Sequence, residues 1–329
     1  YGSLAGAVGM YDHRYRSGPH EHTWHRDHQI IDGGENGVHA TDLVTREAIR
    51  VIEESDGRPF FLYVPFHSVH TPLDERGPFV NRPTQRDPKN EQRWLDEDRI
   101  RWFNDPDGLI QQESDAEKRL LLAAVHHLDD AVGQIVAALH RRGTRENTLI
   151  LFSSDNGPQG SWSGNAYPDD LKLTDFNQPL PFRGKKLDVW EGGIRVPAFA
   201  NWPARLQAGT RSSPMHIIDW FPTLAAIAGV GDVPSGIDGI NLRPHLLEGQ
   251  SIPERDLYWT WHRKKNRWAL RHQDWKIVSY GKKTPSTEAD WQLFNLESHV
   301  REQDDRSVND AAKRQELHQR FLAQQARDR

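Results

Sequence analysis

The chain has 329 residues, which is long enough to bury a large core in one large domain or two. Its 42 Lys and Arg residues are interspersed with 47 Asp and Glu residues, and the net charge of -5 at pH 7 offers no basic field for nucleic acid. The sequence contains no cysteine, which excludes disulfides and thiolate metal ligands. No apolar run is long enough to span a membrane.

Two unbroken apolar runs, residues 60–66 and 149–152, predict strands that are covered on both faces, as in the parallel sheet of an α/β domain. The second run is followed by Ser-Ser-Asp-Asn-Gly-Pro, which contains Asp155 and Asn156. Ligands of such sheets lie beyond the carboxyl ends of the strands, so both side chains would face a ligand site. Asp-Asn-Gly-Pro is also a common turn sequence, and taken alone it favours a simple turn.

Helices are predicted where apolar residues recur at every third or fourth position. One covers residues 41–54, and a stronger one begins at the capping box in residues 114–117 and ends at Gly143. Residues 195–202 predict a third strand, and residues 216–228 another helix. The order strand, helix, strand, strand, helix favours an α/β layer fold.

The pattern changes after about residue 249. Four short runs with turn-forming residues between them predict a small antiparallel sheet of four strands: LYWTWH, RWALR, DWKIVSY and WQLFNL. A charged helix is expected over residues 311–329. We therefore expect an α/β domain in residues 1–248 and a smaller antiparallel-sheet subdomain in residues 249–329.

Four segments, in chain order, resemble those of the sulfatases of the alkaline phosphatase superfamily, and the arylsulfatases most of all: FFLYVPFHSVHTPL, SSDNGP, RGKKLDVWEGGIRVPAFANWP and IIDWFPTLAAIAG. ATDLVTREAIRVI and WQLFNLESHVREQDD look like further landmarks of this family. The resemblance implies an alkaline-phosphatase-like α/β/α sandwich with a smaller C-terminal four-stranded antiparallel sheet plus a helix. It also implies hydrolysis of sulfate monoesters, carried by a small molecule or a glycan.

The resemblance assigns roles to four residues. Asp155 and Asn156 match two ligands of a single Ca²⁺, and carboxylate and amide oxygens are ligands that such a hard cation prefers. His70 matches the histidine that contacts the sulfate and protonates the leaving oxygen, and Lys186 matches the lysine that binds the sulfate oxygens. The alternatives are a histidine satisfied within its loop and a solvated surface lysine, and for Lys185 the latter is favoured.

Other residues near these motifs favour structural roles. Arg183 and Arg195 are attractive as anion clamps, but an arginine flanked by glycine also ties loops together through carbonyl groups. Residues 191–193 are expected to set the backbone geometry near the site, because glycine permits close approach. We expect Asp219 and Thr223 to brace the start of a helix.

Six histidines outside the family motifs need no metal. Four lie in an early polar loop and invite a zinc hypothesis, but their spacing has no structural period and no cysteine accompanies them, so a loop near the substrate is favoured. Two others lie within the capped helix, where packing or solvent explains them. The six are His20, His22, His25, His28, His126 and His127.

The resemblance also implies parts that we expect upstream of Tyr1. These are a formylglycine nucleophile, made by a formylglycine-generating enzyme from a Cys or Ser in a Cys/Ser-x-Pro-x-Arg motif, and two early aspartates that complete the calcium site. The sequence is therefore interpreted as the later two-thirds of a sulfatase, and we expect no turnover from it alone. Its compartment is left open.

Two alternatives stay open. A phosphatase or phosphodiesterase of the same superfamily would hold two zinc ions, and zinc favours imidazole nitrogen, whereas Asn156 offers an oxygen that suits calcium. The other alternative is a non-catalytic binding protein that has kept the fold without the nucleophile.

Overall fold

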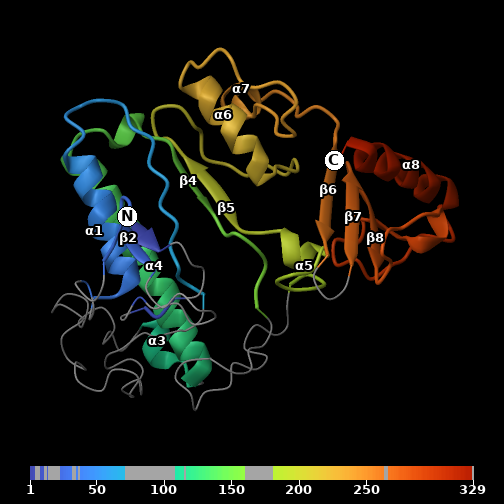
Figure 1. Ribbon diagram of the computed structural model, residues 1–329, viewed down its shortest axis with the longest axis horizontal. Coiled ribbons are helices and arrows are strands. Elements are labelled where there is room, and N and C mark those ends of the chain that lie inside the picture. Colours follow the sequence, from blue (N-terminus) through green and yellow to red (C-terminus); the bar gives the residue numbers. More distant parts are fainter. Residues whose placement is uncertain are drawn as a thin grey trace. The chain divides into compact units, whose positions relative to one another are not determined.

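The computed structural model describes residues 1–3, 8–10, 13, 23–31, 35, 38–70, 108–114, 116–159, 181–262 and 266–327 (Figure 1). Its contacts divide these residues into two compact units. The first holds the described residues up to Glu146, and the second holds those from Asn147 onward. The domain boundary expected after residue 248 lies inside the second unit and stays a prediction.

The first unit is built on two packed helices, α1 (Ala40–Glu53) and α4 (Ala116–Arg141), with the short α3 (Leu109–Gln112) against α4. Both long helices were predicted from their apolar spacing and are confirmed, although Asp115 of the expected capping box lies outside the described residues. Small alanines on α4 allow close packing, and the side chains that are almost completely buried are Leu43, Ile52, Ala123, Ala131 and Ala138. Among the described helices, none combines the length and apolar character needed to cross a membrane.

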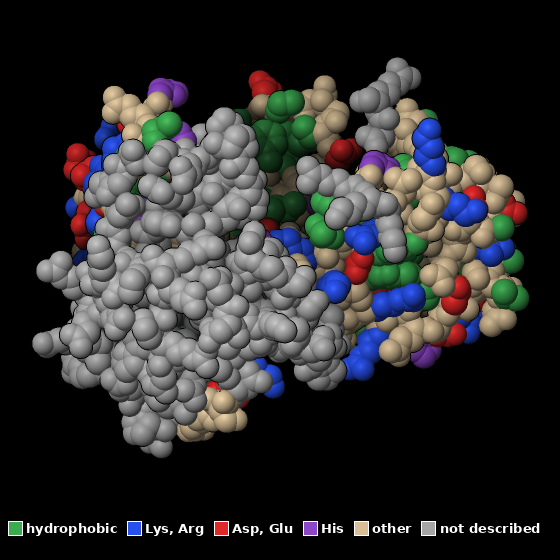
Figure 2. All heavy atoms as spheres, turned by 60° about the horizontal axis from the view of Figure 1, so that its bottom comes forward, with side chains coloured by type: hydrophobic (Ala, Val, Ile, Leu, Met, Phe, Trp, Pro, Cys, Tyr) green, Lys and Arg blue, Asp and Glu red, His purple; other side chains and the backbone are tan. Residues whose placement is uncertain are grey.

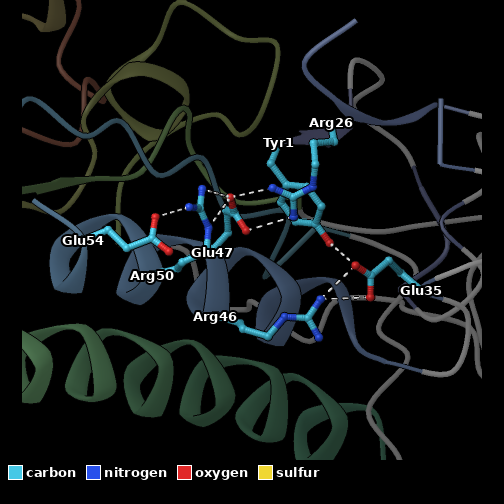
Figure 3. A network of polar contacts seen from close by, with 7 residues as sticks. All are labelled: Tyr1, Arg26, Glu35, Arg46, Glu47, Arg50 and Glu54. Atoms are coloured by element: carbon cyan, nitrogen blue, oxygen red, sulfur yellow. Dashed lines mark hydrogen bonds and ion pairs between the residues drawn. The ribbon is translucent and has the colours of Figure 1, made fainter. Parts of the chain in front are cut away.

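A three-stranded antiparallel sheet, β1 (Gly2–Ser3), β2 (Trp24–Arg26) and β3 (Gln29–Ile30), belongs to the same unit. Trp24 is 1% exposed and packs with Met10 and Leu43. Figure 3 shows the polar network between this part and the outer face of α1, in which Arg26 and Arg46 each make two hydrogen bonds to one carboxylate. The hydrogen bonds from the Arg26 guanidinium are the main reason why the pKa of Glu47 is lowered to about 2.

The strand predicted over residues 60–66 is absent. These residues are extended, but the structure assigns them no strand, and no described strand pairs with them. Phe61 and Tyr63 are each 77% exposed, so the run is not covered on both faces. An apolar run indicates a strand only where a neighbouring segment supplies backbone partners, and the prediction of a covered strand is wrong here.

The second unit begins with β4 (Ile150–Ser153), which follows the 3₁₀ turn η1 (Arg145–Asn147) and pairs with β5 (Ala198–Asn201). Both predicted strands are present, but the pair is antiparallel and β4 is only half-buried. Phe152 and Phe199 stack across the pair with ring centroids 4.9 Å apart, and Phe199 is 51% exposed. The predicted parallel pairing is therefore wrong for these two strands, because apolar content does not specify strand direction.

The helix predicted over residues 216–228 is confirmed as the 3₁₀ turn η2 (Ile217–Asp219) running into α6 (Trp220–Ile227), which packs on α7 (Arg243–Glu248). Asp219 and Thr223 do brace this start, as expected. The Asp219 carboxylate accepts hydrogen bonds from the backbone N–H groups of His216 and Ile240, and the Thr223 hydroxyl accepts one from Leu242 at 2.7 Å.

The predicted antiparallel sheet of four strands is confirmed in the order β6 (Asp256–Trp261), β7 (Arg267–His272), β8 (Trp275–Tyr280) and β9 (Gln292–Asn295). A 3₁₀ turn, η3 (Glu288–Asp290), precedes β9, and the predicted final helix is α8 (Ala311–Arg327). Figure 1 shows α8 beside this sheet.

Successive side chains of each strand point to opposite faces of the C-terminal sheet, and both faces are buried. One face packs under α8, and its core comprises Trp268, Leu270, Ile277, Trp291, Leu293, Leu317 and Phe321. The other face packs against residues 189–190, with Ala269, Val278 and Phe294 at its centre. The segment that follows Lys186 therefore packs against the buried face of this sheet.

Candidate active site

The loop after β4 presents two oxygen-bearing side chains. Asp155 is exposed, and its carboxylate has no hydrogen-bond or ion-pair partner among the described residues. Asn156 is half-buried, and its Nδ2 donates to the Gly157 carbonyl at 3.3 Å, which leaves its Oδ1 available. The Ser154 hydroxyl donates to the Asn156 carbonyl at 3.0 Å and fixes the loop from inside. This segment therefore forms a turn and also presents two side-chain oxygens that could act as ligands.

Glycines hold this loop against residues 191–194, which form the short helix α5 (Glu191–Ile194). The Gly157 N–H donates to the Gly193 carbonyl at 2.9 Å. A Cβ atom on Gly157 would lie 1.8 Å from the Gly192 carbonyl oxygen, and one on Gly193 would lie 2.1 Å from the Asp188 carbonyl oxygen. The expectation that Gly192 and Gly193 serve close backbone approach is confirmed.

Lys186 stands at the second position of a tight turn. The Asp188 N–H donates to the Lys185 carbonyl at 2.9 Å, and Leu187 has a φ of 76°, so the chain reverses around the pair Lys186 and Leu187. The Lys186 N–H donates to the Pro158 carbonyl at 2.9 Å. This bond joins the turn to the loop of Asp155, while the ammonium group of Lys186 has no partner among the described residues.

The same turn is fastened to the C-terminal sheet. The Tyr280 hydroxyl donates to the Asp188 carboxylate at 3.3 Å and accepts from the Val189 N–H at 3.4 Å. Burial, and then the nearby Asp188 charge, raise the pKa of this hydroxyl well above its usual range. Arg267 donates to the Leu187 carbonyl and forms an ion pair with Asp188 at 3.5 Å. Lys186 is therefore carried on a turn that strands β7 and β8 position.

A buried charge network lies under α5. Lys276 of β8 is completely buried, and its ammonium nitrogen lies 2.9 Å from a Glu191 oxygen and 2.8 Å from a Glu302 oxygen. The second Glu302 oxygen accepts the Glu191 backbone N–H at 2.7 Å. Burial raises the pKa of Glu302, and the Lys276 charge acts in the opposite direction. Sequence reasoning missed this network, because its members lie far apart in the chain.

The two arginines left outside the catalytic set differ in their contacts. Arg183 donates to the Glu302 carbonyl at 2.8 Å and lies over the Trp190 ring at 3.7 Å, so it ties loops together as expected. Arg195 lies 3.7 Å from Glu191, with about half of its side chain exposed. Neither contact reaches the Asp155 carboxylate.

His70 lies in the first unit, at the end of the loop that follows residues 60–66. Its N–H donates to the His67 carbonyl at 2.8 Å, and the Ser68 hydroxyl hydrogen-bonds Thr41 at 2.7 Å, which anchors the loop to the start of α1. Burial lowers the pKa of His67, and repulsion from the neighbouring imidazoles of His70 and His13 acts in the same direction. The surroundings of His67 therefore favour its neutral form.

Comparison with known proteins decides the family. A family model described as Sulfatase matches residues 4–230, and one described as N-sulphoglucosamine sulphohydrolase, C-terminal, matches residues 184–327. The chain belongs to the sulfatase family. Mouse arylsulfatase J is 28% identical over 263 residues, which cover 78% of this chain and 37% of that protein. The chain thus spans little more than a third of the length of this curated relative.

Two solved structures place this sulfatase-family chain by its fold. Ps i-CgsB in complex with k-i-k-neocarrahexaose has a TM-score of 0.68 and 26% identity, covering 92% of this chain and 58% of that one. BT4656 in complex with its substrate D-glucosamine-2-N,6-O-disulfate has a TM-score of 0.63 and 20% identity, covering 98% and 74%. The predicted alkaline-phosphatase-like fold, with its C-terminal four-stranded sheet and helix, is confirmed.

The residues of this sulfatase-family chain fit a hard cation only in part. Asp155 and Asn156 offer a carboxylate and an amide oxygen on a fixed loop, but Ca²⁺ takes six to eight oxygen ligands. Among the described residues, no three His, Asp or Glu side chains gather as a metal site. The zinc hypothesis gains no support: His25 bonds the Thr23 carbonyl, His28 is exposed, and His20 and His22 lie outside the described residues.

Sequence reasoning also missed a match to the nucleophile motif. Residues 251–255, Ser-Ile-Pro-Glu-Arg, fit the spacing Ser-x-Pro-x-Arg. Arg255, however, makes an ion pair of 2.5 Å with the fully buried Asp219 and also donates to the Pro214 carbonyl. Ser251 is exposed. Because Arg255 pairs with the residue that directly precedes α6, we assign this segment a structural role.

His126 and His127 follow the expectation of packing or solvent. His127 is 3% exposed, contacts the His39 ring with centroids 4.4 Å apart, and lies 3.1 Å from the Asp42 carboxylate. It joins α4 to the start of α1.

Proposed function

We propose that this chain is the part of a sulfuric ester hydrolase that binds the sulfate group, acting by a calcium-bound formylglycine mechanism. The observation that supports this most is the direct hydrogen bond between the Lys186 turn and the Asp155 loop, at 2.9 Å between the Lys186 nitrogen and the Pro158 oxygen. This backbone bond joins the segment that carries a carboxylate and an amide oxygen to the turn that carries an ammonium group, and the carboxylate and the ammonium have no partner among the described residues. A divalent cation and a tetrahedral anion would satisfy both charges.

Asp155 and Asn156 would hold one Ca²⁺ in this proposal, together with two further carboxylates contributed by the parent protein. The bound ion supplies positive charge that stabilises the nucleophile and the sulfate oxygens. The chain's own contribution is to fix these two oxygens on the loop after β4. The contact of Gly157 with Gly192 keeps that loop from shifting.

Lys186 would bind the sulfate oxygens as a point charge. Its turn, fixed by Arg267 and Tyr280, limits the freedom of the backbone that presents it. His70 would contact the same sulfate and protonate the leaving oxygen, a general-acid role that enzymes most often give to histidine.

The proposed substrate is a small-molecule or glycan sulfate ester. The structure of Ps i-CgsB was solved with a neocarrahexaose and that of BT4656 with a disulfated glucosamine, so relatives of this fold bind glycans. The parent protein would need a formylglycine-generating enzyme to make its nucleophile. We expect no turnover from these 329 residues alone.

A phosphatase or phosphodiesterase is disfavoured by the side chain at position 156. Zinc sites use imidazole nitrogen, whereas Asn156 presents an amide oxygen. A non-catalytic binding homologue would keep the fold and the two loops without turnover.

The test compares hydrolysis of 4-nitrophenyl sulfate and 4-nitrophenyl phosphate by the complete protein that contains this chain. Lys186→Ala should lower kcat/KM for the sulfate ester by about 10²-fold or more, as loss of a charged group at a developing negative charge does. Lys185→Ala is the matched control, because Lys185 is exposed in the same turn. Preferred phosphate hydrolysis, or equal effects of the two variants, would contradict the assignment, and absence of any turnover would favour the binding homologue.

A further inference from the structure

A cavity of about 430 Å³ opens in the second unit beside the segment that carries Lys186. It is lined by Phe182, Arg183, Arg301, Glu302 and Gln303. Two of these residues lie just before the Lys186 turn, and the other three lie in the segment that follows β9. The cavity is therefore formed by two stretches of chain that Arg183 already joins through its bond to the Glu302 carbonyl.

The lining of this cavity presents donors that the protein leaves unused. Arg301 and Gln303 are exposed, and their side chains have no hydrogen-bond or ion-pair partner among the described residues. Arg183 uses one guanidinium nitrogen on the Glu302 carbonyl and stacks on Trp190, which fixes the plane of the guanidinium while its other donors stay available. Arginine in a fixed orientation suits a sulfate or carboxylate, which it can bind through two parallel hydrogen bonds.

The one acidic residue of the lining does not oppose an anion. Both Glu302 oxygens are engaged below the surface, one by Lys276 at 2.8 Å and the other by the Glu191 N–H at 2.7 Å. Arg195 adds further positive charge, since its guanidinium lies over the Phe182 ring at 5.0 Å. Figure 2 shows Lys and Arg side chains on the visible face of the second unit, with apolar, Asp and Glu side chains between them.

The cavity shares its backbone with the proposed sulfate-binding turn. Arg183 precedes Lys186 by three residues, and the Arg183 carbonyl accepts the Gly192 N–H at 2.7 Å, within the segment that packs on the Asp155 loop. Three residues of chain span at most about 10 Å, so a glycan whose sulfate ester lies at Lys186 can extend a neighbouring group towards this cavity. Its aromatic ring and its arginines fit a sugar that carries a negative charge.

We propose that this cavity is a subsite for a second anionic group, a sulfate or a carboxylate, of a glycan substrate. Arg301 and Gln303 bind the group directly, and Arg183 orients it beside Phe182. The subsite rests on the proposed function, because it takes the sulfate at Lys186 as its neighbour. It makes the enzyme selective for glycans that carry two charges over those that carry one.

The complete protein that contains this chain is produced without a formylglycine-generating enzyme, so that its nucleophile is not made and turnover is prevented. It is titrated calorimetrically, in the presence of Ca²⁺, with glucosamine 6-sulfate and with glucosamine 2-N,6-O-disulfate. The disulfate should bind more tightly than the monosulfate. Arg301→Gln should weaken binding of the disulfate about tenfold, the loss expected for one charge-assisted hydrogen bond, and should have little effect on the monosulfate. Arg211→Gln is the control, because this substitution removes the same charge from an exposed arginine of the same unit that does not line the cavity. Gln303→Ala, which leaves the net charge unchanged, should also weaken only the disulfate.

Equal affinity of the wild type for the two sugars, or no binding of either, would overturn the subsite. An equal loss in Arg301→Gln and Arg211→Gln would also overturn it, because the effect would then come from net charge alone. The result is read separately from the assay of Lys186→Ala. If Arg301→Gln weakens binding of the disulfate while Lys186→Ala leaves turnover unaffected, the cavity binds an anion but the proposed function fails.

Discussion

Replacing Lys276 by Met tests the network that positions the candidate site. The ammonium group lies within 2.9 Å of one carboxylate and 2.8 Å of another, and all three side chains are at most 3% exposed. Met fills a similar volume but leaves Glu191 and Glu302 facing each other without a counter-charge. Removing one partner of a buried ion pair destabilises a protein by about 3–5 kcal/mol, a large fraction of the usual stability of a domain.

The loss should depend on pH with a defined sign. The pKa of Glu302 is already raised by burial above its ordinary value of 4.5, and without Lys276 it rises further. The folded variant then retains a proton that the unfolded chain has released. Its free energy of unfolding therefore increases as the pH falls from 7 towards 5, by at most about 1.4 kcal/mol per pH unit for one group.

Urea unfolding followed by tryptophan fluorescence at both pH values measures this, since Trp268 and Trp291 lie in the core of the same sheet. Lys282→Met is the matched control, because Lys282 pairs with Asp290 at 3.1 Å but is 57% exposed, and its loss should stay below about 1 kcal/mol. Adding Glu302→Gln to Lys276→Met should restore part of the stability. A Lys276→Met protein as stable as the Lys282 control, or one without pH dependence, would refute the reasoning.

Three further predictions concern the frame of the site. Asp219→Asn removes the fully buried charge that pairs with the half-buried Arg255 and should lower the free energy of unfolding by about 3–5 kcal/mol at pH 7. Burial would raise the pKa of Asp219, but the hydrogen bonds that its carboxylate accepts from Arg255 and from the backbone hold the pKa below 3.8. The wild type therefore loses the stability that this carboxylate contributes as the pH falls through the lowered pKa, and the Asn variant shows no such loss. Gly157→Ala places a Cβ against the Gly192 carbonyl and should cost about 1–3 kcal/mol, with a shift of the loop amide resonances. Leu187→Gly removes a side chain from a φ of 76° and should raise the melting temperature, consistent with relief of about 1 kcal/mol.

Local patterns in the sequence predict the elements well where one periodicity dominates. The apolar spacing of α4 and the four short runs of the C-terminal sheet give both elements with bounds close to those observed. The antiparallel direction of β4 and β5 does not follow from such patterns, because the two strands are separated by a long connection and nothing in either run encodes its partner. Residues 60–66 show the same limit, since their composition indicates a strand and the fold supplies none.

The candidate site divides in the same way. Asp155, Asn156, His70 and Lys186 were found through a family resemblance that spans several segments, and three of them prove to lie on two loops joined by hydrogen bonds. Lys276 and Glu302 gave no signal, because a lysine in an amphipathic strand and a glutamate in a charged loop read as solvated residues. Their burial arises only when residues 85 and 111 positions apart meet under α5.

The most direct test of the central claim is the calcium content of the complete protein that contains this chain, measured together with its sulfate-ester turnover. We predict one bound Ca²⁺ per chain in the wild type and in Asp232→Ala, whose aspartate is exposed and does not belong to the candidate loop. Asp155→Ala should lose both the ion and turnover. Retention of calcium and activity by Asp155→Ala would contradict the proposal that this loop holds the metal.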